Sequence, residues 1–362
     1  MAGFEGVKWA PHQMRYSLND RKFDIMDANA QIFAVSRSIH YGLFLVFEGI
    51  RFFCRENGKG ELEVVFLNWD KNLQRFKKGI AFNLRSEQQH LVPDVDGLEK
   101  LFIQKYFKHP SMHDFFKGMA RTKAQGYLRP YTVDEEQSIG VTFPVNPSIR
   151  AVVCSYDRYL GEPFSGVAIP NLVRVIGINR TGCLKLGINY LMSVKAVDAA
   201  RKIHADAAAA LFLDDRIHVK LEDRVITEWD SSCCLFGFRD GTVVKIPESP
   251  LILPSVTIIG AVAILKKIGV SVVEKDISYG ELIQKVSNND LVTACSIGTA
   301  GILNRCRELI LVNRKDEMIA THRPDENHDL YRILGDVRTY YWDIYQGNEE
   351  VPEGLKLFRY VL

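Results

Sequence analysis

The sequence predicts an α+β (α/β two-domain) chain, and three observations lead to this prediction. The chain has 362 residues, which is long for one hydrophobic core and comfortable for two domains of roughly 130 to 200 residues each. Strand-like and helix-like stretches alternate in both halves. The stretch GEPFSGVAIPNLVRV, near the middle, is rich in Gly and Pro. We therefore expect domains over 1–160 and 176–362, joined by a connection over 161–175.

The first half begins with a predicted hairpin. FLVFEGIRFFC (44–54) is aromatic and β-branched, the Asn-Gly pair in 56–61 is a turn signal, and LEVVFL (62–67) is the return strand. The next stretch starts at Asn68, a candidate helix cap, and its apolar residues Leu73, Phe76 and Ile80 have helical spacing. A helix-like pattern continues to about 125, and GYLRPYTV and IRAVVCSYDRYLG then predict strands.

The second half alternates in the same way. A helix is expected over about 190–205. It is followed by a stretch with a strand-like pattern and by a hairpin that turns at Asp240-Gly241. LPSVT (253–257) leads into an amphipathic helix, VSVVEKDIS predicts a strand and YGELIQKVSNN another helix. LVTACSIGTAGIL predicts a strand that breaks into a glycine turn.

Composition excludes several classes of protein. The 46 basic residues nearly balance the 44 acidic ones, so no nucleic-acid partner is indicated. No stretch approaches the roughly 18 uninterrupted apolar residues of a membrane span, and the first residues lack a signal-peptide pattern. The seven cysteines form no CxxC pair, so no metal site or disulfide framework is expected. We therefore expect a cytoplasmic protein with reduced thiols.

Lys185, in TGCLKLGINY (181–190), is the strongest candidate for a chemical role. Most lysines that precede a helix are solvated surface groups. A lysine that forms a Schiff base must instead be partly desolvated and closely approached by a planar ligand. The flanking glycines and Tyr190, five residues later, permit such an approach.

Other stretches carry weaker signals. Glu228 ends a strand in a polar turn, where most carboxylates are only solvated. LPSVT and SIGTA (296–300) combine small residues with a threonine where a strand meets a turn or helix, and their N–H groups and hydroxyls could cradle a phosphate. Arg75 lies on a predicted helix, and Tyr127 and Arg129 alternate on one strand face. Each of these residues could equally be an ordinary surface or rim group.

The order of the motifs resembles a known family. HYG, FEGIR, QRF, YLRP, KLGINY, ITE, LPSVT and SIGTA follow one another as in the fold-type IV pyridoxal-phosphate enzymes, specifically the branched-chain amino acid aminotransferases. The likeness runs from about residue 12 to residue 350 and includes the tail DIYQGNEE. It implies a smaller N-terminal α/β domain, a larger C-terminal, barrel-like mixed domain with helices that binds pyridoxal phosphate, and a homodimer.

The resemblance also implies roles for individual residues. Lys185 would form the Schiff base and move the proton, Tyr190 would bond the phenolic oxygen of the cofactor, and Glu228 would pair with the pyridine nitrogen. The phosphate would be clamped by Arg75 and by the turns Val256–Thr257 and Gly298–Thr299. On the substrate side the resemblance implies Tyr41, reaching across the dimer interface, with Tyr127, Arg129, Ser231 and Ala300.

Several departures from the family pattern put substrate identity in doubt. Ile188 replaces a glycine beside the lysine, and Trp229 and Asp230 replace small residues after Glu228. We expect Ile188 and Trp229 to take volume near the cofactor. Ser255 replaces a further glycine and Ile258 an arginine.

The resemblance implies transamination between an apolar or branched-chain L-amino acid and 2-oxoglutarate, giving the 2-oxo acid and L-glutamate. Three alternatives remain open. The first is a D-amino-acid aminotransferase or an aminodeoxychorismate-lyase-like enzyme, which chain length and the DIYQGNEE tail disfavour. The second is an aminotransferase of a specialised biosynthetic pathway with a non-standard amino acid. The third is a non-catalytic relative, which the joint presence of Lys185, Tyr190, Glu228 and Arg75 disfavours.

Overall fold

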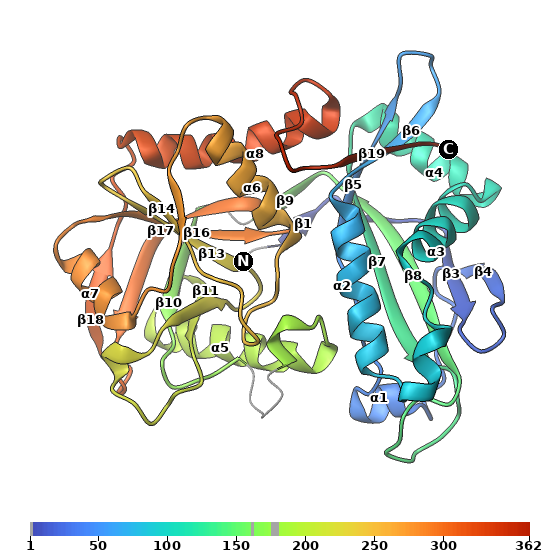
Figure 1. Cartoon of the computed structure of the whole chain (residues 1–362), viewed down its shortest axis with the longest axis horizontal. Coiled ribbons are helices and arrows are strands. Elements are labelled where there is room, and N and C mark those ends of the chain that lie inside the picture. Colours follow the sequence, from blue (N-terminus) through green and yellow to red (C-terminus); the bar gives the residue numbers. More distant parts are fainter. Residues whose placement is uncertain (1–2, 161–162, 175–180) are drawn as a thin grey trace. The chain divides into compact units, whose positions relative to one another are not determined.

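The computed structural model describes residues 3–160, 163–174 and 181–362 (Figure 1). Contacts divide these residues into two units. The N-terminal unit contains Phe4–Arg158, Leu184–Ile188 and Lys356–Leu362. The C-terminal unit contains the described residues of Met1–Gly3, Tyr159–Cys183 and Asn189–Leu355. Both units combine helices and sheets, so the α+β class is confirmed. The ranges 1–160, 161–175 and 176–362 stay a prediction, and residues 161, 162 and 175–180 lie outside the described residues.

An antiparallel sheet organises the N-terminal unit, with strand order β19-β6-β5-β7-β8-β3-β4 and β2 beside β8. Its strands are β2 (Lys8–Trp9), β3 (His12–Ser17), β4 (Phe23–Asp27), β5 (Ile50–Glu56), β6 (Leu62–Leu67), β7 (Gln125–Asp134), β8 (Pro147–Tyr156) and β19 (Leu357–Val361). Its helices and helical turns are α1 (Arg37–Tyr41), α2 (Trp69–Phe82), η1 (Ser86–Leu91), α3 (Val95–Lys100), η2 (Leu101–Phe107), η3 (Pro110–Met112) and α4 (His113–Thr122).

The predicted hairpin and first long helix are confirmed, with two corrections. Strand β5 begins at Ile50 rather than at 44, because Val46 and Phe47 make only isolated bridges. Helix α2 buries the predicted apolar face, Leu73, Phe76 and Ile80. Asn68 does occupy the position before α2, but its side chain does not cap the helix. Its Oδ1 accepts from the N–H of Lys356 at 2.7 Å instead, which fastens the start of β19.

The C-terminal unit is built on a mixed sheet, with strand order β12-β11-β10-β17-β16-β13-β14-β15 and β18 beside β17. Its strands are β10 (Phe164–Ala168), β11 (Ala207–Leu213), β12 (Ile226–Trp229), β13 (Cys233–Phe238), β14 (Val243–Lys245), β15 (Val272–Glu274), β16 (Leu291–Gly298), β17 (Ile302–Val312) and β18 (Met318–His322). Its helices and helical turns are η4 (Thr181–Cys183), α5 (Tyr190–Ile203), η6 (Leu221–Asp223), α6 (Val256–Lys267), α7 (Tyr279–Ser287) and α8 (Asp329–Gln346). Three short elements include residues of both units: β1 (Gly3–Glu5), β9 (Arg158–Leu160) and η5 (Gly187–Asn189).

Two parallel ladders and one helix form a core of this unit. Strand β10 pairs in parallel with β11 and with β17, and α5 packs on β11 (Figure 1). Val167, Ala196, Phe212 and Ile310 meet there in one buried cluster. Small alanines on α5 let the helix lie close to the sheet. Among the described residues, no helix is long and apolar enough to cross a membrane.

Strand β10 lies inside the range predicted as a connection between domains. All five residues of FSGVA are buried, and they pair on both sides. Gly166 has a packing role there, because the ring of Trp229 lies where its side chain would be: a Cβ on Gly166 would be 2.5 Å from that ring. Glycine in this stretch therefore marks a close approach within a sheet rather than a turn.

Trp229 is a core residue, which does not support the expectation that it takes volume near the cofactor. Its ring is fully buried, packs edge-on against Phe164 and donates from Nε1 to the carbonyl of Cys295 at 3.1 Å. Successive side chains of a strand point to opposite faces, so Trp229 and Glu228 point to opposite faces of β12. The departure from the family pattern at Trp229 is therefore a change of core packing.

Gly166→Ala is expected to lower the free energy of unfolding by about 1–3 kcal/mol, because the added methyl group collides with the Trp229 ring. Gly118→Ala, inside α4 where an added Cβ meets nothing within 4 Å, is the matched control. It should be neutral or stabilising by up to about 1 kcal/mol. Urea unfolding of both variants checks the difference. Equal stability of the two variants would show that the Trp229 ring moves aside freely.

Candidate active site

Lys185 belongs to the N-terminal unit, although it comes from the second half of the chain. Its segment pairs with residues 45–47. The N–H of Phe47 donates to the carbonyl of Lys185 at 3.1 Å, and the N–H of Gly187 donates to the carbonyl of Leu45 at 2.8 Å. Val46 and Leu186 form an antiparallel bridge between these two bonds. The lysine is thus held by backbone ladder bonds, which fix where its side chain starts.

The ammonium group of Lys185 is partly withdrawn from water. Its Nζ lies 4.9 Å from the centre of the Phe47 ring. The pKa of Lys185 is lowered to about 8, chiefly by burial and next by the positive charge of Arg75, while the negative charge of Glu48 opposes the shift. A lowered pKa leaves part of the amine unprotonated near neutral pH, which is the state required for attack on a carbonyl carbon.

Arg75 lies on α2, its positive charge acts on Lys185, and its guanidinium is paired with Glu48. Its Nε is 2.5 Å from Oε1 of Glu48, and its Nη2 is 2.7 Å from Oε2. The Glu48 side chain is fully buried and that of Arg75 is nearly so. Glu48 is part of the FEGIR motif, but the sequence predicted no role for it. No local signal identifies it, because the pairing joins residues that are 27 positions apart.

Tyr127 and Arg129 lie on the same face of β7, as strand alternation predicts. Arg129 Nη2 donates to the Tyr127 hydroxyl at 2.8 Å. Its guanidinium lies 4.8 Å from the centre of the Phe47 ring, the ring that Lys185 also approaches. Gly49 makes room for this arrangement, because a Cβ there would be 2.0 Å from the Tyr127 hydroxyl. We call Lys185, Glu48, Arg75, Tyr127 and Arg129, gathered around Phe47, the lysine cluster.

Tyr41 and Ile188 lie at more open positions of the N-terminal unit. Tyr41 ends α1, is 47% exposed, and its hydroxyl donates to the carbonyl of Ile139 at 2.9 Å. Ile188 is 61% exposed. A bulky β-branched side chain is therefore accommodated beside the lysine segment without entering the core.

Glu228 is buried on β12 in the C-terminal unit and pairs with Arg174. Arg174 Nη1 is 2.8 Å from Glu228 Oε1. The same nitrogen donates to the carbonyls of Gly182 and Leu251, each at 3.2 Å. The N–H of Leu253 points to both Glu228 oxygens, at 3.3 and 3.4 Å. Sequence reasoning missed Arg174, which lies in the segment predicted as a connection.

The residues that follow Glu228 form a polar corner. Asp230 is buried and accepts from the N–H of Ala210 at 2.9 Å, and burial raises its pKa to about 6. Ser231 is exposed, whereas the hydroxyl of Ser232 lies 2.6 Å from that of Ser296 on the neighbouring strand. Asp230 thus joins the end of β12 to the middle of β11, which gives the substitution at this position a structural reason.

Both turns predicted to bind the phosphate lie in the C-terminal unit, and both have backbone N–H groups that can donate hydrogen bonds. Helix α6 begins at Val256, followed by Thr257, and the hydroxyl of Ser255 caps it by accepting from the N–H of Ile258 at 3.3 Å. The loss of the family glycine at Ser255 is thus compensated by a helix cap. Gly298 ends β16, and Thr299 and Ala300 form the following turn, all three half-buried. A helix start and a turn of this kind both offer N–H groups to an anion.

The structure therefore gathers the sequence-predicted residues into two sets, one in each unit. Tyr190 begins α5, half-buried, and joins the C-terminal set. The N-terminal set contains Lys185, Arg75, Tyr127, Arg129 and Tyr41. The C-terminal set contains Tyr190, Glu228, Ser231, Val256, Thr257, Gly298, Thr299 and Ala300.

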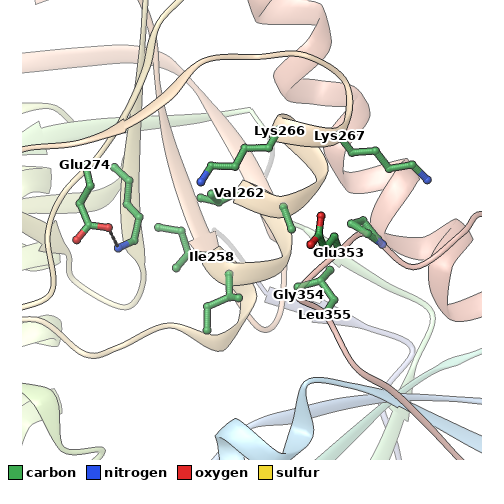
Figure 2. Close-up of a pocket in the computed structure, with 12 residues that line it drawn as sticks. Ile258, Val262, Lys266, Lys267, Glu274, Glu353, Gly354 and Leu355 are labelled. Carbon is green, nitrogen blue, oxygen red and sulfur yellow. Dashed lines mark hydrogen bonds and ion pairs between the residues drawn. The ribbon is translucent and has the colours of Figure 1, made fainter.

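A groove along α6 of the C-terminal unit lies apart from these residues (Figure 2). It has a volume of about 620 Å³, and Ile258, Val262 and Leu355 contribute apolar side chains. Lysines flank it, and one of them, Lys245, pairs with Glu274 at 2.7 Å. No residue of the two sets above lines this groove, so it is not part of the candidate active site.

No protein-family model matches the chain. The chain is 26% identical over 281 residues to branched-chain-amino-acid aminotransferase 2 of Bacillus subtilis (strain 168), spanning 75% of this chain and 69% of that protein. It is 25% identical over an alignment of 374 residues to the branched-chain-amino-acid aminotransferase of Helicobacter pylori (strain J99), spanning 98% of each. The second alignment covers nearly all of both units.

Solved structures show the same fold. The branched-chain aminotransferase of Thermoproteus uzoniensis, crystallised with norvaline, matches with a TM-score of 0.66 at 20% identity, over 94% of this chain and 96% of that one. The branched-chain amino acid aminotransferase of Thermobaculum terrenum in its PLP form matches with a TM-score of 0.65 at 16% identity, over 96% and 98%. The chain is thus similar in sequence to branched-chain-amino-acid aminotransferases and shares the fold of the solved ones.

Proposed function

We propose that the protein is a pyridoxal-phosphate-dependent aminotransferase that exchanges amino groups between an apolar, branched-chain L-amino acid and 2-oxoglutarate. The products are the 2-oxo acid and L-glutamate. The observation that carries the proposal is Lys185, a partly desolvated amine whose pKa is lowered to about 8 and which is fixed by backbone bonds beside a guanidinium. The aminotransferase names of the curated relatives support the reaction class.

The chemistry of the donor set fits the cofactor. Arg75 is a cation, and the start of α6 and the turn at Gly298–Ala300 offer N–H groups, as a phosphate requires. Glu228 is a buried carboxylate suited to a pyridine nitrogen, and Lys185 is an amine suited to an aldehyde. Pyridoxal phosphate, when bound, supplies an aldehyde carbon that accepts amino groups and a ring that withdraws electrons.

The residues of the chain would then share the remaining work. Lys185 would take the proton from the α-carbon of the substrate and deliver it again. Glu228 would hold a proton at the ring nitrogen, and Tyr190 would bond the phenolic oxygen. Arg129, Tyr127, Tyr41, Ser231 and the N–H of Ala300 would bind the substrate, with the Phe47 ring as an apolar wall.

A panel of amino donors tests the proposed reaction. We expect glutamate to form from 2-oxoglutarate with at least one of L-valine, L-leucine and L-isoleucine, with an uneven preference among them. One methylene group is worth only about 1–3 kcal/mol in a pocket, so the bulk of Ile188 is enough to reorder the three. Matched D-amino acids should be inactive. Turnover confined to D-amino acids, or lyase activity alone, would place the chain in another branch of fold type IV, and a colourless protein without activity would make it a non-catalytic relative.

We also propose a homodimer and a cytoplasmic location. Several exposed apolar side chains lie on α1, just before it, and in the loop over 138–145 of the N-terminal unit. Monomeric proteins rarely expose so many apolar groups in one region. The exposed members of this apolar patch are Phe33, Val35, Ile39, Tyr41, Ile139, Val141, Phe143 and Val145. A second copy of the chain is the proposed occupant, and sedimentation of the purified protein tests it. The cysteines, all free, suit a reducing compartment.

A further inference from the structure

Glu48 is a buried carboxylate to which the proposed reaction assigns no role. Its side chain is fully buried, and two residues one turn apart on α2 hold it. Arg75 binds both of its oxygens, at 2.5 and 2.7 Å, and Asn72 Nδ2 lies 3.3 Å from Oε2. The N–H of Gly49 donates to the same oxygen at 3.1 Å. A carboxylate out of water requires this degree of pairing, because an unpaired charge there is strongly unfavourable.

The position of Glu48 in the chain also places it beside Lys185. It follows Phe47, whose N–H bonds the carbonyl of Lys185 and whose ring lies 4.9 Å from the lysine Nζ. The lysine cluster therefore contains three cations, Lys185, Arg75 and Arg129, and one carboxylate, Glu48. Like charges this close repel one another, and the single anion reduces the repulsion.

We propose that Glu48 is a positioning residue of the active site, which fixes the Arg75 guanidinium and supplies the negative charge that balances Arg75 and Lys185 together. A guanidinium is planar, so holding Nε and Nη2 also fixes the direction of Nη1. The phosphate would then meet a guanidinium whose orientation Glu48 has already fixed. This last point rests on the proposed function, whereas the charge balance does not.

The charge balance has a measurable consequence for the lysine. Among the described residues, the charged and titratable groups that act on Lys185 include Arg75 on α2, Glu48, and Tyr127 and Arg129 on β7. Arg75 favours loss of the lysine proton and Glu48 favours its retention. Removing Glu48 alone should make Lys185 lose its proton at lower pH, and removing Arg75 alone should have the opposite effect.

Trace acetylation of the full chain, freed of cofactor, measures this effect. Mass spectrometry of the Lys185 peptide gives the rate of acetylation as a function of pH. Only the unprotonated amine reacts, so the midpoint of the rate profile reports its protonation. We expect the wild-type midpoint near 8. The order of midpoints should be Glu48→Gln, then wild type, then Glu48→Gln/Arg75→Gln, then Arg75→Gln as the highest. Neighbouring steps should differ by on the order of one pH unit or less. The exposed Lys59 is the internal control and should show one profile in all four proteins.

An unchanged Lys185 profile in folded Glu48→Gln would overturn the proposal. If that variant fails to fold, the neutral double variant and Arg75→Gln give the same comparison, and equal midpoints in those two would also overturn it. Failure of the proposed function has a different signature. The wild type would then bind no pyridoxal phosphate, detected by its absorbance, while the order of midpoints is unaffected.

Discussion

Lys185→Ala is expected to lower the turnover number for transamination by about 10⁴-fold or more. The substitution removes both the amine that reacts with the cofactor aldehyde and the base that moves the α-proton, and each contribution is large. Ladder bonds hold Lys185 inside the lysine cluster, and Arg75 and Arg129 carry no amine that could replace it. Steady-state rates of glutamate formation measure the loss.

The matched control is Lys195→Ala, which removes an exposed lysine on α5 ten residues later and should retain wild-type rates. Borohydride treatment of wild-type protein incubated with pyridoxal phosphate gives an independent measurement. Peptide mapping should find the cofactor on the Lys185 peptide. A label on another lysine, or an active Lys185→Ala enzyme, would contradict the assignment.

Arg174→Met is expected to lower the free energy of unfolding by about 3–5 kcal/mol. The substitution removes the guanidinium 2.8 Å from Glu228 and so weakens the pairing of a buried carboxylate. Methionine fills a similar volume, so the loss reports the charge rather than a cavity. Replacing both partners, as Arg174→Met/Glu228→Gln, should recover much of the loss, since a neutral pair carries no such penalty.

Lys202→Met is the matched control for this effect. Lys202 pairs with Asp198 at 3.1 Å on the solvent side of α5, where both side chains are more than half exposed. Its removal should change stability by less than about 1 kcal/mol. Urea unfolding of the four proteins provides the comparison. A cost for Arg174→Met no larger than that of Lys202→Met would mean that Glu228 is not held as an ion in the folded protein.

Arg75 and Glu228, which we expect at the cofactor, each already have a partner of opposite charge within the chain. Arg75 is paired with Glu48 and Glu228 with Arg174. Such pairs hold the charged groups in place before a ligand arrives, so less reorganisation is needed on binding.

Local patterns in the sequence were sufficient for many elements. The Asn-Gly turn and its flanking β-branched residues predicted the β5–β6 hairpin, and the spacing of Leu73, Phe76 and Ile80 predicted the buried face of α2. Strand alternation placed Tyr127 and Arg129 on one face of β7. These features depend on residues close together in the chain, where turn chemistry and periodicity act directly.

Only the tertiary structure decided the features that depend on distant partners. The sequence by itself determined the class of fold and identified Lys185 as the candidate lysine. It contained no local sign that this lysine's segment pairs with residues 45–47, that Glu48 holds Arg75, or that Arg174 holds Glu228. Gly166 and Trp229 are a further example. From the sequence alone Gly166 suggests a turn, and only the structure shows that the Trp229 ring fills the space of its missing side chain. Ion pairs across 27 and 54 positions, and backbone bonds across about 140, are set by which strands and helices meet, and no spacing along the chain encodes that.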